Sequence, residues 1–128
     1  MKTISLENAK RLQELGLTST ESHFFYMVCG GMNYLRPRAT TRVNPCDVLI
    51  PSYTADEIGN MLPEKHIKDG VERDLHMWWF GGWRCGYLNE AEIMLYEEGD
   101  TMADAMALML VYLLENKYIN AAGLNEVK

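Results

Sequence analysis

Residues 102–114, near the C-terminus, are apolar on almost every side of a helix. A helix of this kind has no polar face to turn toward water. It must therefore cross the centre of a hydrophobic core or share its surface with a partner, and both alternatives are open. Thr101 just before the segment is a typical N-cap, so we predict one long helix that ends near Lys117.

Residues 65–97 have the pattern of an antiparallel meander on which this helix can pack. Turn signals divide the segment at Asp69-Gly70, Gly81-Gly82 and Asn89-Glu90. The sequence therefore predicts an α+β fold, in which an antiparallel sheet of about four to six strands packs against two or three helices. The long C-terminal helix is expected on the core face of the sheet.

The first half of the chain carries the remaining predicted elements. A capping box at Thr54 and Glu57 indicates the start of a short helix that Pro63 stops. The other predicted elements are a helix over 6–15 capped by Ser5 and strands over 23–29, 32–35 and 47–50. With 128 residues and no linker, residues 1–128 are predicted to be a single domain.

A two-residue loop at Gly81-Gly82 would pair Phe80 with Trp83 and give the hairpin two distinct faces. The predicted core face holds Val71, Leu75, Met77, Trp79, Leu88, Ala91, Ile93 and Leu95. The opposite face holds His76, Trp78, Phe80, Trp83, Cys85, Tyr87, Met94 and Tyr96. Arg84 does not fit this register, because it would point into the core, and either a cation–π contact or a β-bulge would explain it.

The second face is more aromatic than a solvated sheet face normally is, so something must cover it. Three covers are open: other segments of this chain, a second copy of the chain, or a ligand whose planar group stacks on the rings. For a ligand, the candidate binding residues are His76, Trp78, Trp83 and Tyr87.

Arg36, Arg38 and Arg42 form the one local basic cluster of an acidic chain. Guanidinium groups present paired donors to phosphate oxygens, so the cluster is a candidate phosphate site. Together with stacking aromatic rings it would suit a nucleotide. The alternative is a solvated loop.

Composition and charge narrow the function classes. The net charge of −6, with scattered acidic residues, disfavours general nucleic-acid binding, because the phosphate backbone requires neutralising cations. The longest apolar run, 105–114, is shorter than the roughly 20 residues of a membrane helix, and no signal peptide is recognisable. We therefore predict a cytoplasmic protein without membrane association.

Three cysteines, Cys29, Cys46 and Cys85, match neither a disulfide framework nor a zinc-binding spacing. Cys85 and His76 are the best available pair for nucleophilic catalysis, although their aromatic neighbours do not suit a thiolate. No phosphate loop or other catalytic motif accompanies them. We predict no metal and no cofactor, and an enzymatic activity has no support in the sequence.

Residues 51–63, 98–107 and 113–116 resemble segments of small uncharacterised proteins encoded by bacteriophages and prophages. The resemblance implies no established activity and identifies no site residue. It implies a class of roles, because accessory phage proteins often bind a host protein, bind nucleotides or blunt a defence system. We therefore predict non-enzymatic binding, to a protein partner or to itself, with capture of a nucleotide or another small anion as the alternative.

Overall fold

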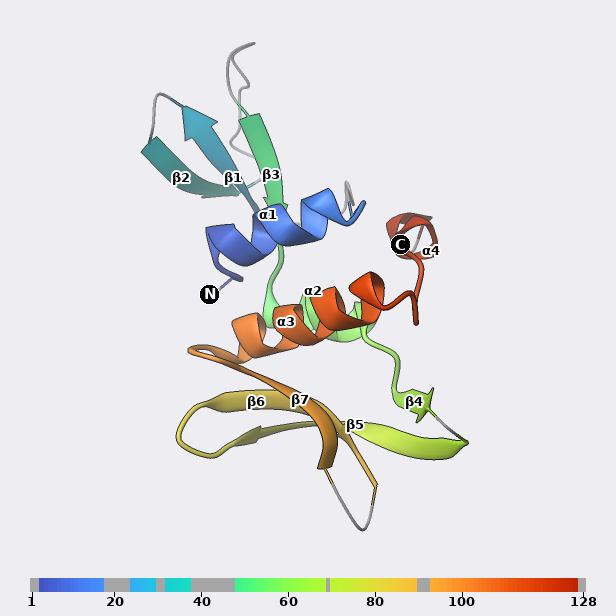
Figure 1. The fold of residues 1–128 in the computed structure, drawn as a ribbon. Helices are drawn as coiled ribbons and strands as arrows, with labels where there is room; N and C mark the ends of the chain where they lie inside the picture. Colours follow the sequence, from blue (N-terminus) through green and yellow to red (C-terminus); the bar gives the residue numbers. More distant parts are fainter. Residues whose placement is uncertain are drawn as a thin grey trace.

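A computed structural model describes residues 3–17, 24–29, 32–37, 48–68, 70–89 and 93–126 of the 128-residue chain. The predicted α+β class is confirmed, and the described strands form two antiparallel sheets (Figure 1). The helices are α1 (Leu6–Glu14), α2 (Ala55–Met61), α3 (Met102–Glu115) and α4 (Ala121–Glu126). The strands are β1 (Phe24–Cys29), β2 (Met32–Pro37), β3 (Val48–Ser52), β4 (Lys65–Lys68), β5 (Val71–Trp79), β6 (Trp83–Leu88) and β7 (Ile93–Gly99).

The first sheet has the strand order β2-β1-β3, with β1 antiparallel to both neighbours. Its strands were expected from the sequence, although β3 continues through Pro51 to Ser52 rather than ending at Ile50. Proline lacks an N–H group and is confined to positions where the ladder does not need one. Because β3 lies at the edge of its sheet, Pro51 is tolerated within the strand.

The second sheet is the predicted meander, with the order β4-β5-β6-β7. Its central hairpin pairs Trp79 with Trp83, so the loop has three residues, Phe80, Gly81 and Gly82. The predicted two-residue loop was therefore wrong by one position. Gly81 adopts φ = 69°, a conformation that glycine enters without steric cost, and this residue closes the longer loop.

The one-residue shift exchanges the two faces of β6. Trp83, Cys85 and Tyr87 lie on the same face as Leu75, because Tyr87 pairs with Leu75. We call this the core face, since Cys85 and Tyr87 are fully buried on it. Arg84 pairs with Trp78 on the opposite face, here called the outer face, and its unexpected position in the predicted register is thereby explained.

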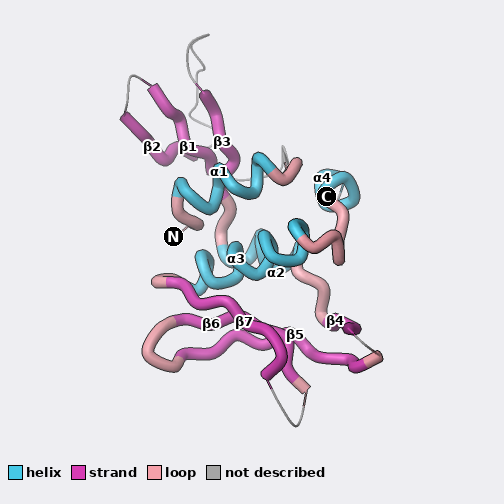
Figure 2. Tube along the Cα trace, in the orientation of Figure 1, coloured by secondary structure: helices cyan, strands magenta, loops and turns pink. Residues whose placement is uncertain are grey.

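Helix α3 lies on the core face and packs mainly against β6 and β7. Figure 2 shows the helices above the four-stranded sheet. Helix α1 lies between α3 and the three-stranded sheet and contacts β3 (Figure 1). The apolar segment predicted for the centre of the fold is indeed central. Its buried side chains are Ala103, Ala105, Met106, Ala107, Met109, Leu110, Val111, Leu113 and Leu114.

The helix caps follow the sequence closely. Thr54 and Glu57 form the predicted capping box, with Thr54 Oγ1 accepting from the Glu57 amide at 3.2 Å and Glu57 Oε1 from the Thr54 amide at 3.0 Å. Asp104 joins two helix starts: its Oδ1 accepts from the Ser5 amide at 2.7 Å and from Asn8 Nδ2 at 2.9 Å. This carboxylate therefore fixes the start of α1 against the first turn of α3.

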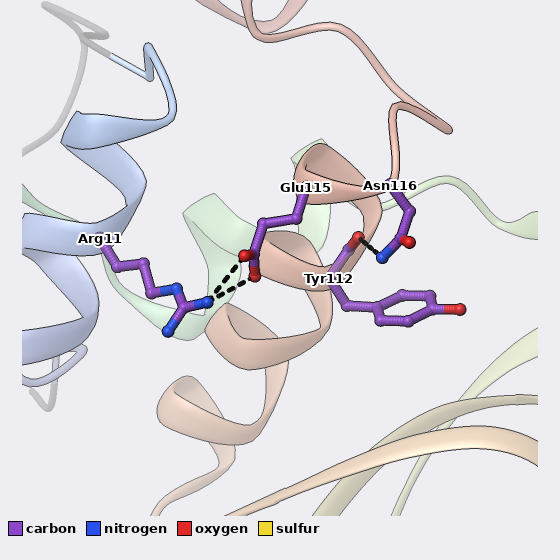
Figure 3. A network of polar contacts seen from close by, with 4 residues as sticks. All are labelled: Arg11, Tyr112, Glu115 and Asn116. Atoms are coloured by element: carbon purple, nitrogen blue, oxygen red, sulfur yellow. Dashed lines mark hydrogen bonds and ion pairs between the residues drawn. The ribbon is translucent and has the colours of Figure 1, made fainter.

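An ion pair joins the same two helices at their other ends. Arg11 Nη2 donates to Glu115 Oε1 at 2.7 Å and to Oε2 at 2.8 Å, and Asn116 Nδ2 donates to the Tyr112 carbonyl at 2.9 Å (Figure 3). Both charged side chains are about half exposed, so the pair contributes at most about 1 kcal/mol. Burial of α3, rather than this contact, holds the helices together.

Candidate functional site

The most unusual surface of the protein is an exposed group of large apolar side chains around the β5–β6 turn. We define the aromatic tip as Met77, Trp78, Trp79, Phe80 and Tyr96. Trp79 and Phe80 are 61% and 69% exposed, and Met77 and Tyr96 are 41% and 45% exposed. Exposed apolar side chains gathered in one place mark an interaction site more often than the same residues scattered singly.

The strand order explains why the tip is uncovered. Helix α3 packs mainly over β6 and β7, whereas β5 lies beyond β6 in the sheet. Met77 and Trp79 point to the core face, but they stand on β5, which is not one of the strands against which the helix mainly packs. The prediction that both belong to the core was therefore wrong, because the helix is too narrow to cover four strands.

The rings of this surface pack against one another and against Arg84. Trp78 and Tyr96 lie with ring centroids 6.0 Å apart, and Trp79 meets Trp83 edge to face at 5.5 Å. The Arg84 guanidinium stacks 5.1 Å from the centre of the Phe80 ring and 5.0 Å from that of Tyr96. Such packing reduces the conformational entropy that binding would cost.

Arg84 is the residue of this candidate site that the predicted register concealed. Besides the two rings, its Nε lies 3.5 Å from Glu98 Oε1, so its charge is already paired. Arg84 therefore organises the outer face and is not a free cation for a phosphate. The sequence did carry a signal, because a single arginine among predicted core positions indicates a wrong register.

The candidate ligand residues of the hairpin are only partly brought together. His76 and Trp78 lie on the outer face, whereas Trp83 lies on the core face and is partly buried. Tyr87 is fully buried, and its hydroxyl donates to the Pro63 carbonyl at 2.7 Å. The assignment of Tyr87 to a ligand site is therefore corrected to a core role, as a direct consequence of the three-residue loop.

The arginine cluster does not meet the aromatic residues where the structure describes it. Arg36 lies in β2, paired with Phe25 in the three-stranded sheet. Helices α1 and α3 separate that sheet from β5 (Figure 1). Arg38 and Arg42 lie outside the described residues. A single nucleotide site built from Arg36 and Trp78 is therefore inconsistent with the fold.

The predicted thiol and base point to opposite faces of the sheet. His76 pairs with Gly86, and Cys85 pairs with Met77, so the alternation of the strands separates the two side chains. Cys85 is fully buried, and burial raises the pKa of its thiol to about 12. The suggested pairing of Cys85 with His76 is wrong, and the thiol stays protonated at neutral pH.

We expect Cys85 to react with iodoacetamide at least about 100-fold more slowly at pH 8 in the folded protein than in urea, because only the thiolate is nucleophilic. Mass spectrometry after digestion measures this rate for each cysteine. The neutral thiol contributes its full share of stability below the ordinary thiol pKa of 9.0, and that share is lost as the pH rises toward 12. Equal rates in the two states would contradict the buried position.

Two polar side chains outside the predicted ligand site are buried at the far end of the core face. His66 in β4 lies opposite Arg73 in β5 in the strand register, and their exposed fractions are only 5% and 2%. The His66 ring meets Tyr118 edge to face at 4.5 Å, and Arg73 Nη1 donates to the Val71 carbonyl at 3.4 Å. These contacts close the core beneath the end of α3.

A hollow of about 350 Å³ lies where α2 and α3 begin, beside Trp83. Its lining includes the carboxylates of Asp56 and Asp100. Two carboxylates oppose the binding of a phosphate by simple charge repulsion. Among the described residues, no group of histidine, cysteine and acidic side chains is arranged to hold a metal ion.

Comparison with protein families, with curated proteins and with solved structures finds no match for this chain. Within the part of the chain that the structure describes, no helix has the length and hydrophobicity needed to cross a membrane. The site must therefore be interpreted from its own geometry, which is that of an α+β protein with an exposed, pre-organised aromatic tip.

Proposed function

We propose that this protein acts by binding a polypeptide chain through the aromatic tip, without catalysis. The observation that carries the proposal is the exposure of Met77 and Trp79 on the core face, followed directly by the exposed Phe80 in the turn of the same hairpin. Tryptophan and other aromatic residues dominate the energetic centres of protein interfaces. An accessory role of this kind, in a phage or prophage and in the cytoplasm, is part of the proposal.

Several observations favour a polypeptide over a small anion. The Arg84 guanidinium is stacked between two rings and paired with Glu98. Arg36 belongs to the other sheet, and the hollow beside Trp83 includes Asp56 and Asp100 in its lining. The side chains of the tip are also exposed, whereas small ligands are normally bound in enclosed pockets. The tip instead offers apolar area and an exposed strand.

Site-specific photocrosslinking tests this proposal. A photoreactive benzophenone amino acid replaces Trp79, and the protein is irradiated in cells of its natural source. Leu35, which is 41% exposed on the three-stranded sheet, provides the matched control position. We expect discrete polypeptide adducts, either with the chain itself or with one other protein, from position 79 and not from position 35.

Two results would count against the proposal. One is the absence of any polypeptide adduct specific to position 79. The other is protection of the tryptophans from acrylamide quenching by added nucleotides, which would favour the small-anion alternative. All three tryptophans of the chain lie in the β5–β6 hairpin, so their fluorescence reports directly on this surface.

A further inference from the structure

Within the described part of the chain, one half of β5 is an open sheet edge. Strand β4 pairs only with residues Val71 to Asp74 of β5, and the Leu75 amide donates to the Glu64 carbonyl at 2.9 Å. Beyond Leu75, no described strand pairs with residues 76–79 on the side away from β6. Among the strands that the structure describes, about half of β5 therefore has a neighbour on one side only.

The backbone groups that face this edge can be assigned from the alternation of an antiparallel ladder. The Leu75 amide points to the β4 side, whereas the Phe80 amide donates to Gly82 on the β6 side at 3.0 Å. The N–H and C=O groups of Met77 and Trp79 therefore point outward, and those of His76 and Trp78 point to β6. The open edge presents two donors and two acceptors.

The other edges of both sheets carry devices that discourage pairing with a further strand. Pro37 lies in β2, Pro51 in β3 and Lys65 in the short β4. Strand β7 carries Glu97 and a bulge near its start. The segment 76–79 has neither a proline, a bulge nor a residue among Asp, Glu, Lys and Arg.

We propose that the partner at this edge is a second copy of the chain, whose β5 pairs antiparallel with the first about a two-fold axis at Trp78. This inference rests on the proposed function and names its partner. The two copies then form one continuous eight-stranded sheet. Met77 and Trp79 of each copy exchange backbone hydrogen bonds with Trp79 and Met77 of the other.

The register of the two paired β5 strands follows from the position of Glu64, which lies beside the open edge at Leu75. An axis at Met77 would place the second Trp79 opposite Leu75, where Glu64 already accepts the Leu75 amide. An axis at Trp78 instead places the turn residue Gly81, where strand β5 has already ended, opposite Leu75, and it keeps every outward-facing group of Met77 and Trp79 paired. Isologous pairing of this kind requires a self-complementary strand, which residues 76–80 provide.

Side-chain chemistry supports the same register. On the core face each Met77 meets a Trp79, a favourable sulfur–aromatic contact. On the outer face the two Trp78 side chains lie opposite one another, and each His76 lies opposite a Phe80. No like charges face each other in the segment, despite the net charge of −6 of each chain.

The area is sufficient for a specific dimer. Trp79, Phe80 and Met77 are each substantially exposed in one copy. Covering them together with the strand edge removes on the order of 1,000 Å² from water in the dimer, near the lower limit for stable interfaces. A dimer of moderate affinity is therefore the expected state.

The test measures solution mass by light scattering over a wide range of concentration, together with amide hydrogen exchange. We expect a mass twice the 14.7 kDa of one chain. Met77→Lys and Trp79→Lys should each raise the dissociation constant at least tenfold, because lysine on an edge strand opposes pairing. Leu35→Lys is the matched control, since Leu35 and Met77 are equally exposed at 41%.

Hydrogen exchange identifies the edge itself. The amides of Met77 and Trp79 should exchange at least tenfold more slowly at concentrations where the dimer forms, and Trp79 should lose this protection in Met77→Lys. A strictly monomeric wild type would overturn the inference. So would a dimer in which these amides stay unprotected, or one that Tyr96→Lys dissociates and Met77→Lys does not.

The outcomes separate this inference from the proposed function. A monomer whose position 79 crosslinks to a different protein would overturn the self-pairing and leave the polypeptide-binding role intact. Melting temperatures of the lysine variants within a few degrees of the wild type establish that the fold persists. Using two edge variants keeps the test decisive if one of them does not fold.

Discussion

Replacing Gly99 by alanine is expected to destabilise the protein by about 3 kcal/mol or more, in the range of severe steric substitutions. A Cβ at Gly99 would lie 2.6 Å from the Ala105 amide nitrogen, 3.0 Å from the Asp104 carbonyl carbon and 3.1 Å from the Ala105 Cα. All three atoms belong to the backbone of α3, so no side-chain rotation relieves the clash. The end of β7 and the first turns of α3 would have to separate.

Urea unfolding followed by circular dichroism measures this effect. The midpoint should fall by about 2 M if the slope is about 1.5 kcal/mol per molar urea. Gly123→Ala is the matched control, because a Cβ there meets nothing within 4 Å and the residue lies in α4. That variant should be unchanged or up to about 1 kcal/mol more stable. Equal effects at both positions would refute the close approach of β7 and α3.

Leu110→Ala is expected to cost about 2–5 kcal/mol, as truncation of a fully buried leucine does. Leu110 is 0% exposed in the middle of α3. The same helix contacts α1, α2, β6 and β7, so the cavity would open where all these elements meet. The free energy of urea unfolding, measured at low protein concentration, gives the cost.

Phe80→Ala is expected to have a much smaller effect on stability than Leu110→Ala. Because Phe80 is 69% exposed, its truncation should change the free energy of unfolding of the monomer by less than about 1 kcal/mol. Association should weaken in the same variant, since Phe80 belongs to the aromatic tip. A large loss of monomer stability on Phe80→Ala would show that the tip is part of the core, and the proposed function would then lose its basis.

The two pairs of variants together separate folding from binding. Gly99 and Leu110 act where α3 meets the sheet, whereas Phe80 and Met77 act on a hairpin end that the helix leaves uncovered. Natural proteins do not usually leave a rigid aromatic surface and an unprotected strand edge in the same place. Their coincidence at one hairpin is the physical reason to expect a partner strand.

Local signals in the sequence predicted most of the helix and strand elements. Ser5, Thr54 and Thr101 each cap a helix as expected, because an N-cap hydroxyl satisfies an amide only one turn away. The apolar segment predicted for the core is the central helix α3. These features depend on neighbours in the chain, and the sequence contains them fully.

The predicted site was wrong in part, because it depended on the length of one turn. Gly81-Gly82 is compatible with a two-residue and a three-residue loop, and the choice between them reverses the orientation of Trp83, Cys85 and Tyr87. The three-residue loop buries Cys85 and Tyr87 under α3 and places Arg84 on the outer face. Packing of the whole hairpin against the helix selects this register, since it buries apolar rather than charged side chains.

By itself, the sequence determined the fold class, the helix caps, the meander and the presence of more aromatic side chains than one sheet face can hide. Only the tertiary structure decided which of those side chains are covered. Helix α3 is one helix wide and packs mainly over β6 and β7, so Tyr87 is buried while Trp79 on the neighbouring strand is exposed. The burial of a side chain depends on the tertiary structure, because the residues that cover it lie far apart in the chain.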